Sequence, residues 1–313
     1  MTGNYLTMKA SELFDSARLE ALAKGDETLL MQYDRCGLLI APGETAEEFA
    51  ARLKKLYGAL KTLESELKNG AVCEVSPGIR IANSMQIPSA VVQEALSVTE
   101  KLYDVRTDWV PGFFANESFG MLWGGCSLSD PESGLALFII RKNFRQRQNW
   151  LFYNRRELLA HEMTHAAHQV FDQWLFEEYF AYRTAESRSR KFFGGCFIHK
   201  YDALGFLLPI LLVPIAQFLN ILDILPLPMR VFWILSAVYP LFLCIRTCWI
   251  NRLAAGARNT LQKRGIKQAD AVLFRMSVEE IKLLASGKLP QGSDLRWKLL
   301  NKRLSTEVDH ADR

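Results

Sequence analysis

Apolar and polar positions alternate with helical spacing in several stretches of the first hundred residues. Residues 45–68 give the clearest pattern, in which apolar side chains recur every three or four positions: Phe49, Leu53, Leu56, Tyr57 and Leu60. Thr45 followed by Glu48 has the spacing of a capping box, so this helix is predicted to begin at Thr45. Residues 8–34 and 88–103 are also predicted to be helical.

Short β-rich stretches lie in the middle of the chain. Residues 71–83 are predicted to be extended, and residues 118–128 and 134–143 form two β-rich runs separated by a turn sequence rich in Asp, Pro and Gly. Two further helices are predicted at residues 155–170 and 174–190, joined by a short turn. The pattern therefore predicts a small antiparallel sheet that precedes a pair of helices.

The composition changes sharply after residue 200. Residues 203–222 carry no charge, and a helix of twenty residues at ~1.5 Å per residue crosses a hydrocarbon core of ~30 Å. Residues 231–245 are also apolar, and Arg246 beyond them can extend its charge toward water while apolar character continues to Ile250. A membrane hairpin is predicted here; the alternative is a buried hairpin in the core of a soluble protein.

Basic residues flank this hairpin on its outer sides, while the linker holds only Arg230. Those on the outer sides are Arg188, Arg190, Lys191, Lys200, Arg252, Arg258, Lys263 and Arg264. Because basic flanks remain on the cytoplasmic side, both termini are predicted to be cytoplasmic, and a lipid bilayer is a predicted partner.

The composition excludes several classes of protein. Of the 313 residues, 49% are hydrophobic and 23% are charged, which is typical of a globular protein. The net charge of +4 is mild and no basic face is evident, so no nucleic-acid partner is expected. The six cysteines are scattered without a CxxC pair, which argues against a disulfide framework or a zinc ribbon. The polar N-terminus lacks the apolar region of a secretory signal, so a reducing, cytoplasmic-type compartment is expected for the first two hundred residues.

The residues with the clearest chemistry form an HExxH motif at 161–165. His161 and His165 lie one helical turn apart on one face, so both imidazoles can reach one metal ion. Zinc is predicted, because it accepts imidazole and carboxylate ligands and keeps an open position for water. Glu162 beside them is predicted to be the general base and acid. The alternative is a helix with two unrelated surface histidines.

A catalytic zinc site takes three protein ligands, so one more is needed. If the two helices fold back about a turn between residues 171 and 172, residue 165 lies opposite residue 178. Glu178 is therefore the predicted third ligand. Glu177 is the competing choice for a turn centred half a residue earlier, and a solvated surface carboxylate is the alternative for either.

The HEMTH sequence followed by Glu178-Tyr179-Phe180-Ala181-Tyr182 resembles the gluzincin group of zinc metallopeptidases. The resemblance covers roughly residues 115–190 and implies His161, His165 and Glu178 as zinc ligands, with Glu162 as general base and acid.

The same resemblance implies that residues 134–143 are an edge strand that pairs with an extended peptide substrate. The chain departs from the group in two respects. The gap from His165 to Glu178 is short, and both hydrophobic segments follow Glu178, whereas in the prenyl-protein proteases membrane segments can lie between the motif and the glutamate. We therefore use the resemblance to predict the chemistry of the site, and we do not use it to predict the substrate.

Several neighbouring residues could belong to the site. A cysteine ahead of HExxH is similar to the arrangement of peptide deformylases, so Cys126 is either a ligand or a small buried residue. His168 is too far along the helix to share the metal and is expected near the ligands or on the surface. Candidates for stabilising an oxyanion are Tyr153, Tyr179 and Tyr182, and those for orienting an imidazole are Glu157 and Asp172.

The predicted fold class is α+β, mainly helical, with a small antiparallel sheet before the HExxH helix and a two-helix membrane hairpin. The expected parts are an N-terminal helical region (1–70), a metallopeptidase-like catalytic domain (71–200), the transmembrane hairpin (201–250) and a C-terminal cytoplasmic helical tail (251–313). The expected function is a membrane-anchored zinc metallopeptidase acting on a peptide or protein substrate. The alternatives are a non-catalytic membrane-anchored scaffold or regulator, and a metallohydrolase of non-peptide amides.

Overall fold

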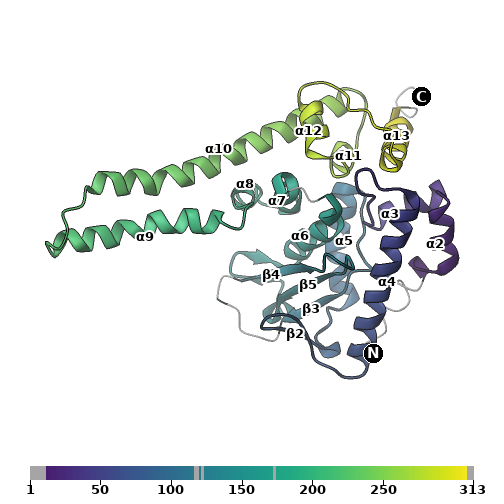
Figure 1. The fold of residues 1–313 in the computed structure, drawn as a ribbon, viewed down its shortest axis with the longest axis horizontal. Helices are drawn as coiled ribbons and strands as arrows, with labels where there is room; N and C mark the ends of the chain where they lie inside the picture. Colours follow the sequence, from purple (N-terminus) through teal and green to yellow (C-terminus); the bar gives the residue numbers. More distant parts are fainter. Residues whose placement is uncertain (1–11, 116–119, 121–122, 172–173, 309–313) are drawn as a thin grey trace.

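A computed structural model describes residues 12–115, 120, 123–171 and 174–308 (Figure 1). The described chain is mainly helical, contains small sheets, and has two long apolar helices that project from the body. This confirms the mainly helical α+β class at the level of its elements.

The N-terminal part consists of α2 (Ser16–Ala23), α3 (Glu27–Arg35) and α4 (Ala46–Lys68). The single helix predicted over the first part of this region is wrong, because the chain turns at Gly25, whose φ of 80° favours glycine. Asp26 then begins α3 by accepting hydrogen bonds from the next turn. The predicted capping box at the start of α4 is confirmed, with both of its hydrogen bonds present.

The sheets are short. The predicted extended segment forms a hairpin of β1 (Cys73–Ser76) and β2 (Ile79–Ile81). The central sheet has the order β3–β5–β4, with β3 (Gly112–Ala115), β4 (Gly125–Ser129) and β5 (Ala136–Arg141). The pair β4–β5 is antiparallel as predicted, but β3 is parallel to β5, so this sheet is mixed.

The expected edge strand is in the wrong place. β5, within residues 134–143, is the central strand, and β4 is the edge strand instead. The reason is β3, which the sequence pattern did not single out and which occupies the second side of β5. The run Ala136–Ile140 is buried at every position, as expected for a strand with neighbours on both sides.

The middle of the chain contributes the helices of the candidate site. α5 (Ser89–Tyr103) and α6 (Arg155–His168) occur as predicted. The short η1 (Asn83–Met85) precedes α5. After the central sheet, the chain reaches α6 through η2 (Lys142–Arg145) and the two-residue strands β6 (Asn149–Trp150) and β7 (Tyr153–Asn154). After α6, the short η3 (Gln169–Phe171) leads to α7 (Trp174–Arg183).

The helix predicted over residues 174–190 is interrupted after Arg183. A second helix, α8 (Arg188–Phe193), begins at Ser187, whose side chain accepts a hydrogen bond from the backbone of Arg190. The short η4 (Gly194–Cys196) then leads toward the apolar helices.

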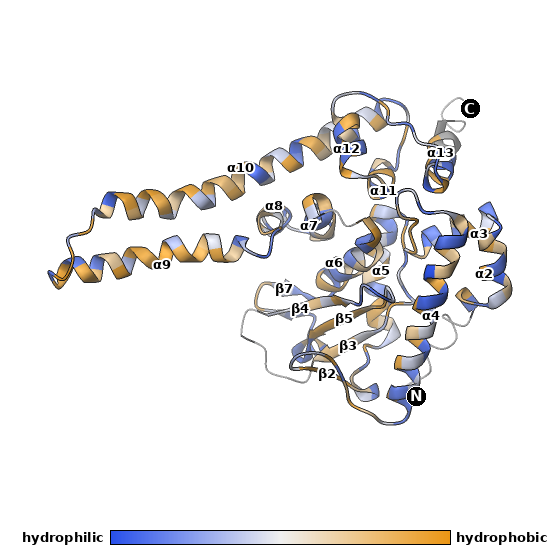
Figure 2. Ribbon diagram, in the orientation of Figure 1, coloured by the Kyte–Doolittle hydropathy of each residue, from blue (hydrophilic) through white to orange (hydrophobic). Residues whose placement is uncertain are grey.

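Those helices are α9 (Asp202–Ile221) and α10 (Met229–Gln262), and both are long and apolar enough to cross a membrane. Figure 2 shows them as a hairpin of largely hydrophobic residues that stands away from the body. Only 11% of the most apolar window in each helix is buried, so the alternative of a buried core hairpin does not describe this structure.

The C-terminal region packs onto the body. α10 continues past its apolar half and is followed by α11 (Ala269–Leu273), α12 (Val278–Ala285) and α13 (Leu295–Val308). Side chains of these helices share one buried cluster with Tyr103 of α5 and Phe176 of α7. The C-terminal region thus contributes to the same core as the candidate site.

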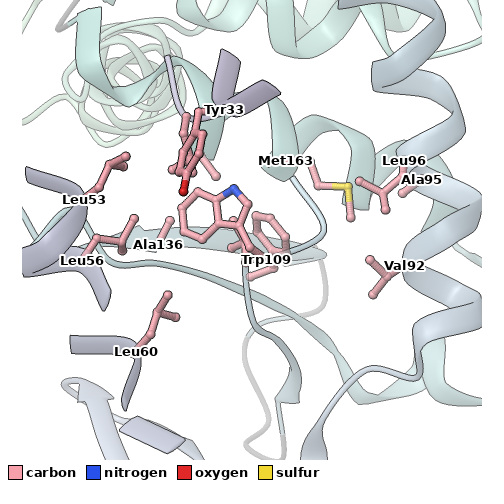
Figure 3. Close-up of a cluster of buried hydrophobic side chains, with 14 of the residues drawn as sticks. Tyr33, Leu53, Leu56, Leu60, Val92, Ala95, Leu96, Trp109, Ala136 and Met163 are labelled. Carbon is pink, nitrogen blue, oxygen red and sulfur yellow. The ribbon is translucent and has the colours of Figure 1, made fainter. Parts of the chain in front are cut away.

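A second buried cluster supports the other side of α6. Figure 3 shows Trp109 between leucines of α4 and Met163 of α6, and its indole nitrogen donates to the Cys36 carbonyl at 2.8 Å. Leu159, Ala160 and Met163 all face this core. Because one side of α6 is fixed in the core, its opposite side is held toward β4 and α7.

Candidate metal centre

The two histidines of the motif lie together on the side of α6 that faces α7. Their Nε2 atoms are 3.1 Å apart. His165 is hydrogen-bonded through Nδ1 to Glu177 Oε1 at 2.9 Å, and His161 donates to the backbone carbonyl of Ala181. A carboxylate on Nδ1 of His165 keeps a proton on that nitrogen, so Nε2 is the atom of this ring that could ligate a metal, as in metal-ligating histidines.

Glu178 closes the third side of this group. Its carboxylate oxygens lie 3.6 Å from Nε2 of His165 and 3.7 Å from Nε2 of His161. Zinc–nitrogen and zinc–oxygen bonds of ~2.0–2.1 Å in a tetrahedron place neighbouring ligand atoms about 3.3 Å apart. The observed separations are close to this value, although the two carboxylate distances belong to different oxygens, and the three ligand atoms lie within 4.8 Å of one another, so the group could hold a metal ion.

The adjacent glutamates of α7 therefore occupy different positions. The Glu178 carboxylate faces both Nε2 atoms, whereas Glu177 contacts the opposite edge of the His165 ring. Of the two alternatives for a third ligand, the geometry favours Glu178. Among the described residues, the one group of at least three His, Cys, Asp or Glu side chains with metal-binding spacing is His161, His165 and Glu178.

Glu162 is buried between α6 and the edge strand β4, where it accepts a hydrogen bond from the backbone of Ser127. Burial raises the pKa of this carboxyl to about 7. Nearby His165 and the hydrogen bond from Ser127 act in the opposite direction, and Glu178 adds to the increase. A carboxyl with a pKa near neutrality suits a proton acceptor at neutral pH.

The charges around the histidines affect the two rings in opposite directions. Burial lowers the pKa of His165, but Glu177, Glu178 and Glu162 outweigh it and raise the value to about 9. Burial and the neighbouring His165 lower the pKa of His161 well below its usual range. The carboxylates thus stabilise a positive charge on His165, while His161 stays neutral.

A cavity of about 340 Å³ opens onto the cluster. Both histidines, Glu162, Glu177 and Glu178 line it, together with Cys126, Ser127 and Ser129 of β4. Cys126 thus borders the cavity but does not belong to the metal-binding group, and burial raises the pKa of its thiol to about 11. This position does not favour Cys126 as a ligand, and its side chain is half-buried at the cavity wall.

The expectation of a surface position for His168 is wrong. This residue is buried, and its ring contacts Phe171, Phe180 and Phe274. Phe274 follows α11, more than a hundred residues further along the chain. The spacing of residues on α6 alone could not predict that Phe274 covers the His168 ring.

The candidate tyrosines have separate surroundings. The Tyr182 ring lies against His161 with ring centroids 4.5 Å apart, and its pKa is raised by burial and by Glu178. Tyr179 points elsewhere, since its hydroxyl accepts a hydrogen bond from Arg258 of α10 at 2.9 Å. Tyr153 lies under the guanidinium of Arg190.

Of the two residues considered for orienting an imidazole, Glu157 has other partners. Glu157 is paired with Arg190 and accepts a hydrogen bond from the backbone of Glu186 at 3.1 Å, and Asp172 lies outside the described residues. The orienting contacts come from Glu177 and from the backbone of Ala181 instead. A sequence signal for Glu177 did exist, because it directly precedes the proposed ligand on α7.

No family model matches this chain, and neither the curated proteins nor the solved structures give a significant match. The geometry of the site and the surrounding helices therefore carry the functional argument alone.

Proposed function

We propose that this chain is a membrane-anchored, zinc-dependent metallopeptidase of the gluzincin type. The observation that carries the proposal is the convergence of His161 Nε2, His165 Nε2 and the Glu178 carboxylate, with the buried Glu162 carboxyl beside them. A purely structural metal site needs no such base, which favours an enzyme over a scaffold.

In the proposed hydrolysis, Glu162 and Tyr182 have separate roles beside the metal. When bound, zinc supplies a Lewis acid that makes water more acidic and polarises a carbonyl group. Glu162 takes the proton of the attacking water and later gives it to the leaving amine. Tyr182 is the candidate donor to the carbonyl oxygen, because its phenol lies near Glu178 and Glu162 and its raised pKa keeps it protonated.

A peptide substrate fits the position of β4. One side of this strand pairs with β5, and its other side pairs with no described strand. Three of its residues line the cavity that holds the cluster. An extended peptide that adds to this edge would cross in front of Glu162 and the histidines, which favours peptides over smaller amides.

The membrane part of the proposal rests on the projecting hairpin. The apolar surfaces of α9 and α10 are exposed along most of their length, and such a surface is stable when lipid covers it. The basic residues on both outer flanks favour cytoplasmic termini and a cytoplasmic metal centre.

The test uses the full-length protein purified in mild detergent. We expect one zinc ion per chain by mass spectrometry of metals, and loss of that zinc in His161→Ala. Glu162→Gln should retain zinc and lose cleavage of a quenched fluorescent peptide library by at least a hundredfold, since general acid–base catalysis contributes 10²–10⁴-fold. Chelation should abolish wild-type cleavage, and added zinc should restore it.

Two results would contradict the proposal. Purified wild-type protein without stoichiometric zinc would remove the metal centre, and undiminished cleavage by Glu162→Gln would remove the assigned role of this carboxyl. Zinc binding together with no cleavage of any library member would support the non-catalytic alternative.

A further inference from the structure

The turn between β6 and β7 has an unusual sequence for its backbone. Trp150 pairs with Tyr153, so Leu151 and Phe152 alone make the turn. Leu151 has a φ of 50°, a conformation that favours glycine, asparagine or aspartate. Both side chains are also largely exposed, 55% for Leu151 and 59% for Phe152. A strained and exposed apolar turn points to a function outside the fold.

This turn is continuous with α8. The Phe152 ring contacts the Tyr153 ring at 4.5 Å between centroids, and the guanidinium of Arg190 lies 5.8 Å from the centre of the Tyr153 ring. Arg190 belongs to α8, which ends at the exposed Phe193. Figure 2 shows β7 and α8 on the side of the body from which α9 projects.

The start of the apolar hairpin is marked by a buried ion pair. Asp202, the first residue of α9, accepts a hydrogen bond from Arg246 of α10 at 2.6 Å and another from the Tyr239 hydroxyl at 3.0 Å. The exposed rings of Phe197 and Tyr201 lie in the segment just before Asp202. If the hairpin crosses a bilayer, these rings are at the depth where aromatic side chains border the headgroups.

The same segment is positively charged. Residues 187–201 contain Arg188, Lys191 and Lys200, together with Arg190, whose charge is paired with Glu157, and no acidic residue. Basic side chains close to a membrane are attracted by anionic lipid headgroups. Aromatic rings and basic groups on one surface together match the chemistry of an anionic bilayer surface.

We propose that the Leu151–Phe152 turn and residues 187–201 form a membrane-docking surface that rests in the headgroup layer of an anionic bilayer. This surface contacts the membrane beside the hairpin. The body therefore keeps a fixed orientation relative to the bilayer and is not attached through α9 and α10 alone. The inference rests on the proposed membrane insertion of the hairpin and is independent of the peptidase activity.

The experiment places the photocrosslinker benzoylphenylalanine at single positions of the full-length protein in lipid nanodiscs, with lipid adducts detected by mass spectrometry. Phe152 is the test position. Leu289, 41% exposed in the segment between α12 and α13, is the negative control, and Leu211, 56% exposed on α9, is the positive control for insertion. We expect lipid adducts at 152 and 211 and at least tenfold fewer at 289.

The outcomes separate the two proposals. Adducts at 211 without adducts at 152 would overturn the docking surface and leave the hairpin in the membrane. An absence of adducts at both positions would overturn membrane insertion and the docking surface together. Equal adduct yields at 152 and 289 would show non-specific lipid contact and would also overturn the docking surface.

The charge component is tested by lipid composition. We expect nanodiscs with one third phosphatidylglycerol to give several-fold more adduct at position 152 than nanodiscs of phosphatidylcholine alone. The combined changes Arg188→Gln, Lys191→Gln and Lys200→Gln should abolish this increase while leaving the adducts at 211 unchanged. An adduct yield at 152 that does not depend on anionic lipid would overturn the preference for an anionic surface.

Discussion

At the scale of single residues, the adjacent Glu177 and Glu178 of α7 have different contacts with the two histidines. Glu178 faces the two Nε2 atoms, while Glu177 accepts the Nδ1 hydrogen bond of His165. A helix turns by roughly 100° per residue, so adjacent side chains point in different directions from the same backbone. One carboxylate can thus reach the metal position, and the other fixes the orientation of a ligand ring.

The roles of these glutamates predict different zinc affinities. Glu178→Ala should lose stoichiometric zinc, because it removes a proposed ligand. Glu177→Gln should retain the ligands and bind zinc about 10–100-fold more weakly, the usual effect of losing a carboxylate partner of a ligating histidine. Competition with a chelator of known affinity measures both.

Glu132→Gln, an exposed residue in the β4–β5 turn, serves as the control and should bind zinc like wild type. If Glu177→Gln lost as much affinity as Glu178→Ala, the two residues would not have distinct roles.

At the scale of elements, capping residues in the sequence predicted where helices begin, but the sequence did not predict which strands pair with each other. The capping box of α4 and the helix that carries HExxH could be placed from sequence. Counting across the helical hairpin brought His165 near both competing glutamates, Glu177 at 2.9 Å and Glu178 at 3.6 Å. The break before α8 was missed, although Ser187 carried a capping signal. The order β3–β5–β4 could not be predicted. β3 pairs with β5 in parallel, and two parallel strands are not connected by a short turn whose sequence could be recognised.

The junction of α8 with η4 depends on one glycine. A Cβ at Gly194 would lie 2.2 Å from the ring of Tyr182, whereas the nearest atom to a Cβ at Gly195 would be 4.0 Å away. Gly194→Ala should therefore displace Tyr182 and destabilise the protein by about 1–3 kcal/mol, the usual range for overpacking. Gly195→Ala is the matched control.

Thermal unfolding in detergent and peptide cleavage measure the effects of the two alanine substitutions. We expect Gly194→Ala to lower both the midpoint and the cleavage rate, because Tyr182 packs on His161. Equal behaviour of the two alanine variants would show that the ring can move without consequence.

At the scale of the whole molecule, long-range contacts fix the C-terminal helices to the rest. Asp34 at the end of α3 is buried and paired with Arg275, 2.8 Å away, and with Arg303 of α13. His168 is covered by Phe274 from the same region. Neither contact could be predicted from the sequence, because the partners are separated by a hundred or more residues and by the whole apolar hairpin.

Asp34→Asn should destabilise the protein by about 3–5 kcal/mol at neutral pH, because it removes the carboxylate that pairs with the buried Arg275, whereas Arg303 keeps its pair with Asp104. Burial opposes ionisation of Asp34, but Arg275 and Arg303 outweigh it and hold its pKa below the usual range. Stability from this pairing is therefore complete above the unfolded pKa of about 3.9 and is lost as the pH falls through the folded value.

Thermal midpoints in detergent measured from pH 7 to pH 3 check this behaviour. The difference between wild type and Asp34→Asn should be constant down to about pH 4 and should shrink below it. The exposed Asp15→Asn is the control and should follow wild type at every pH. A difference that grows as the pH falls would contradict the assigned sign.

α10 is one continuous helix, so the rotation and position of its apolar half determine those of its C-terminal half. Its apolar half belongs to the projecting hairpin, and further along Arg258 contacts both Tyr179 of α7 and Asp270 of α11. One alanine inserted after Ile250 would turn everything beyond it by roughly 100° and advance it by ~1.5 Å. The guanidinium would then leave its partners, so zinc affinity should fall even though no ligand has changed, whereas the same insertion in the linker between α9 and α10 should have no such effect.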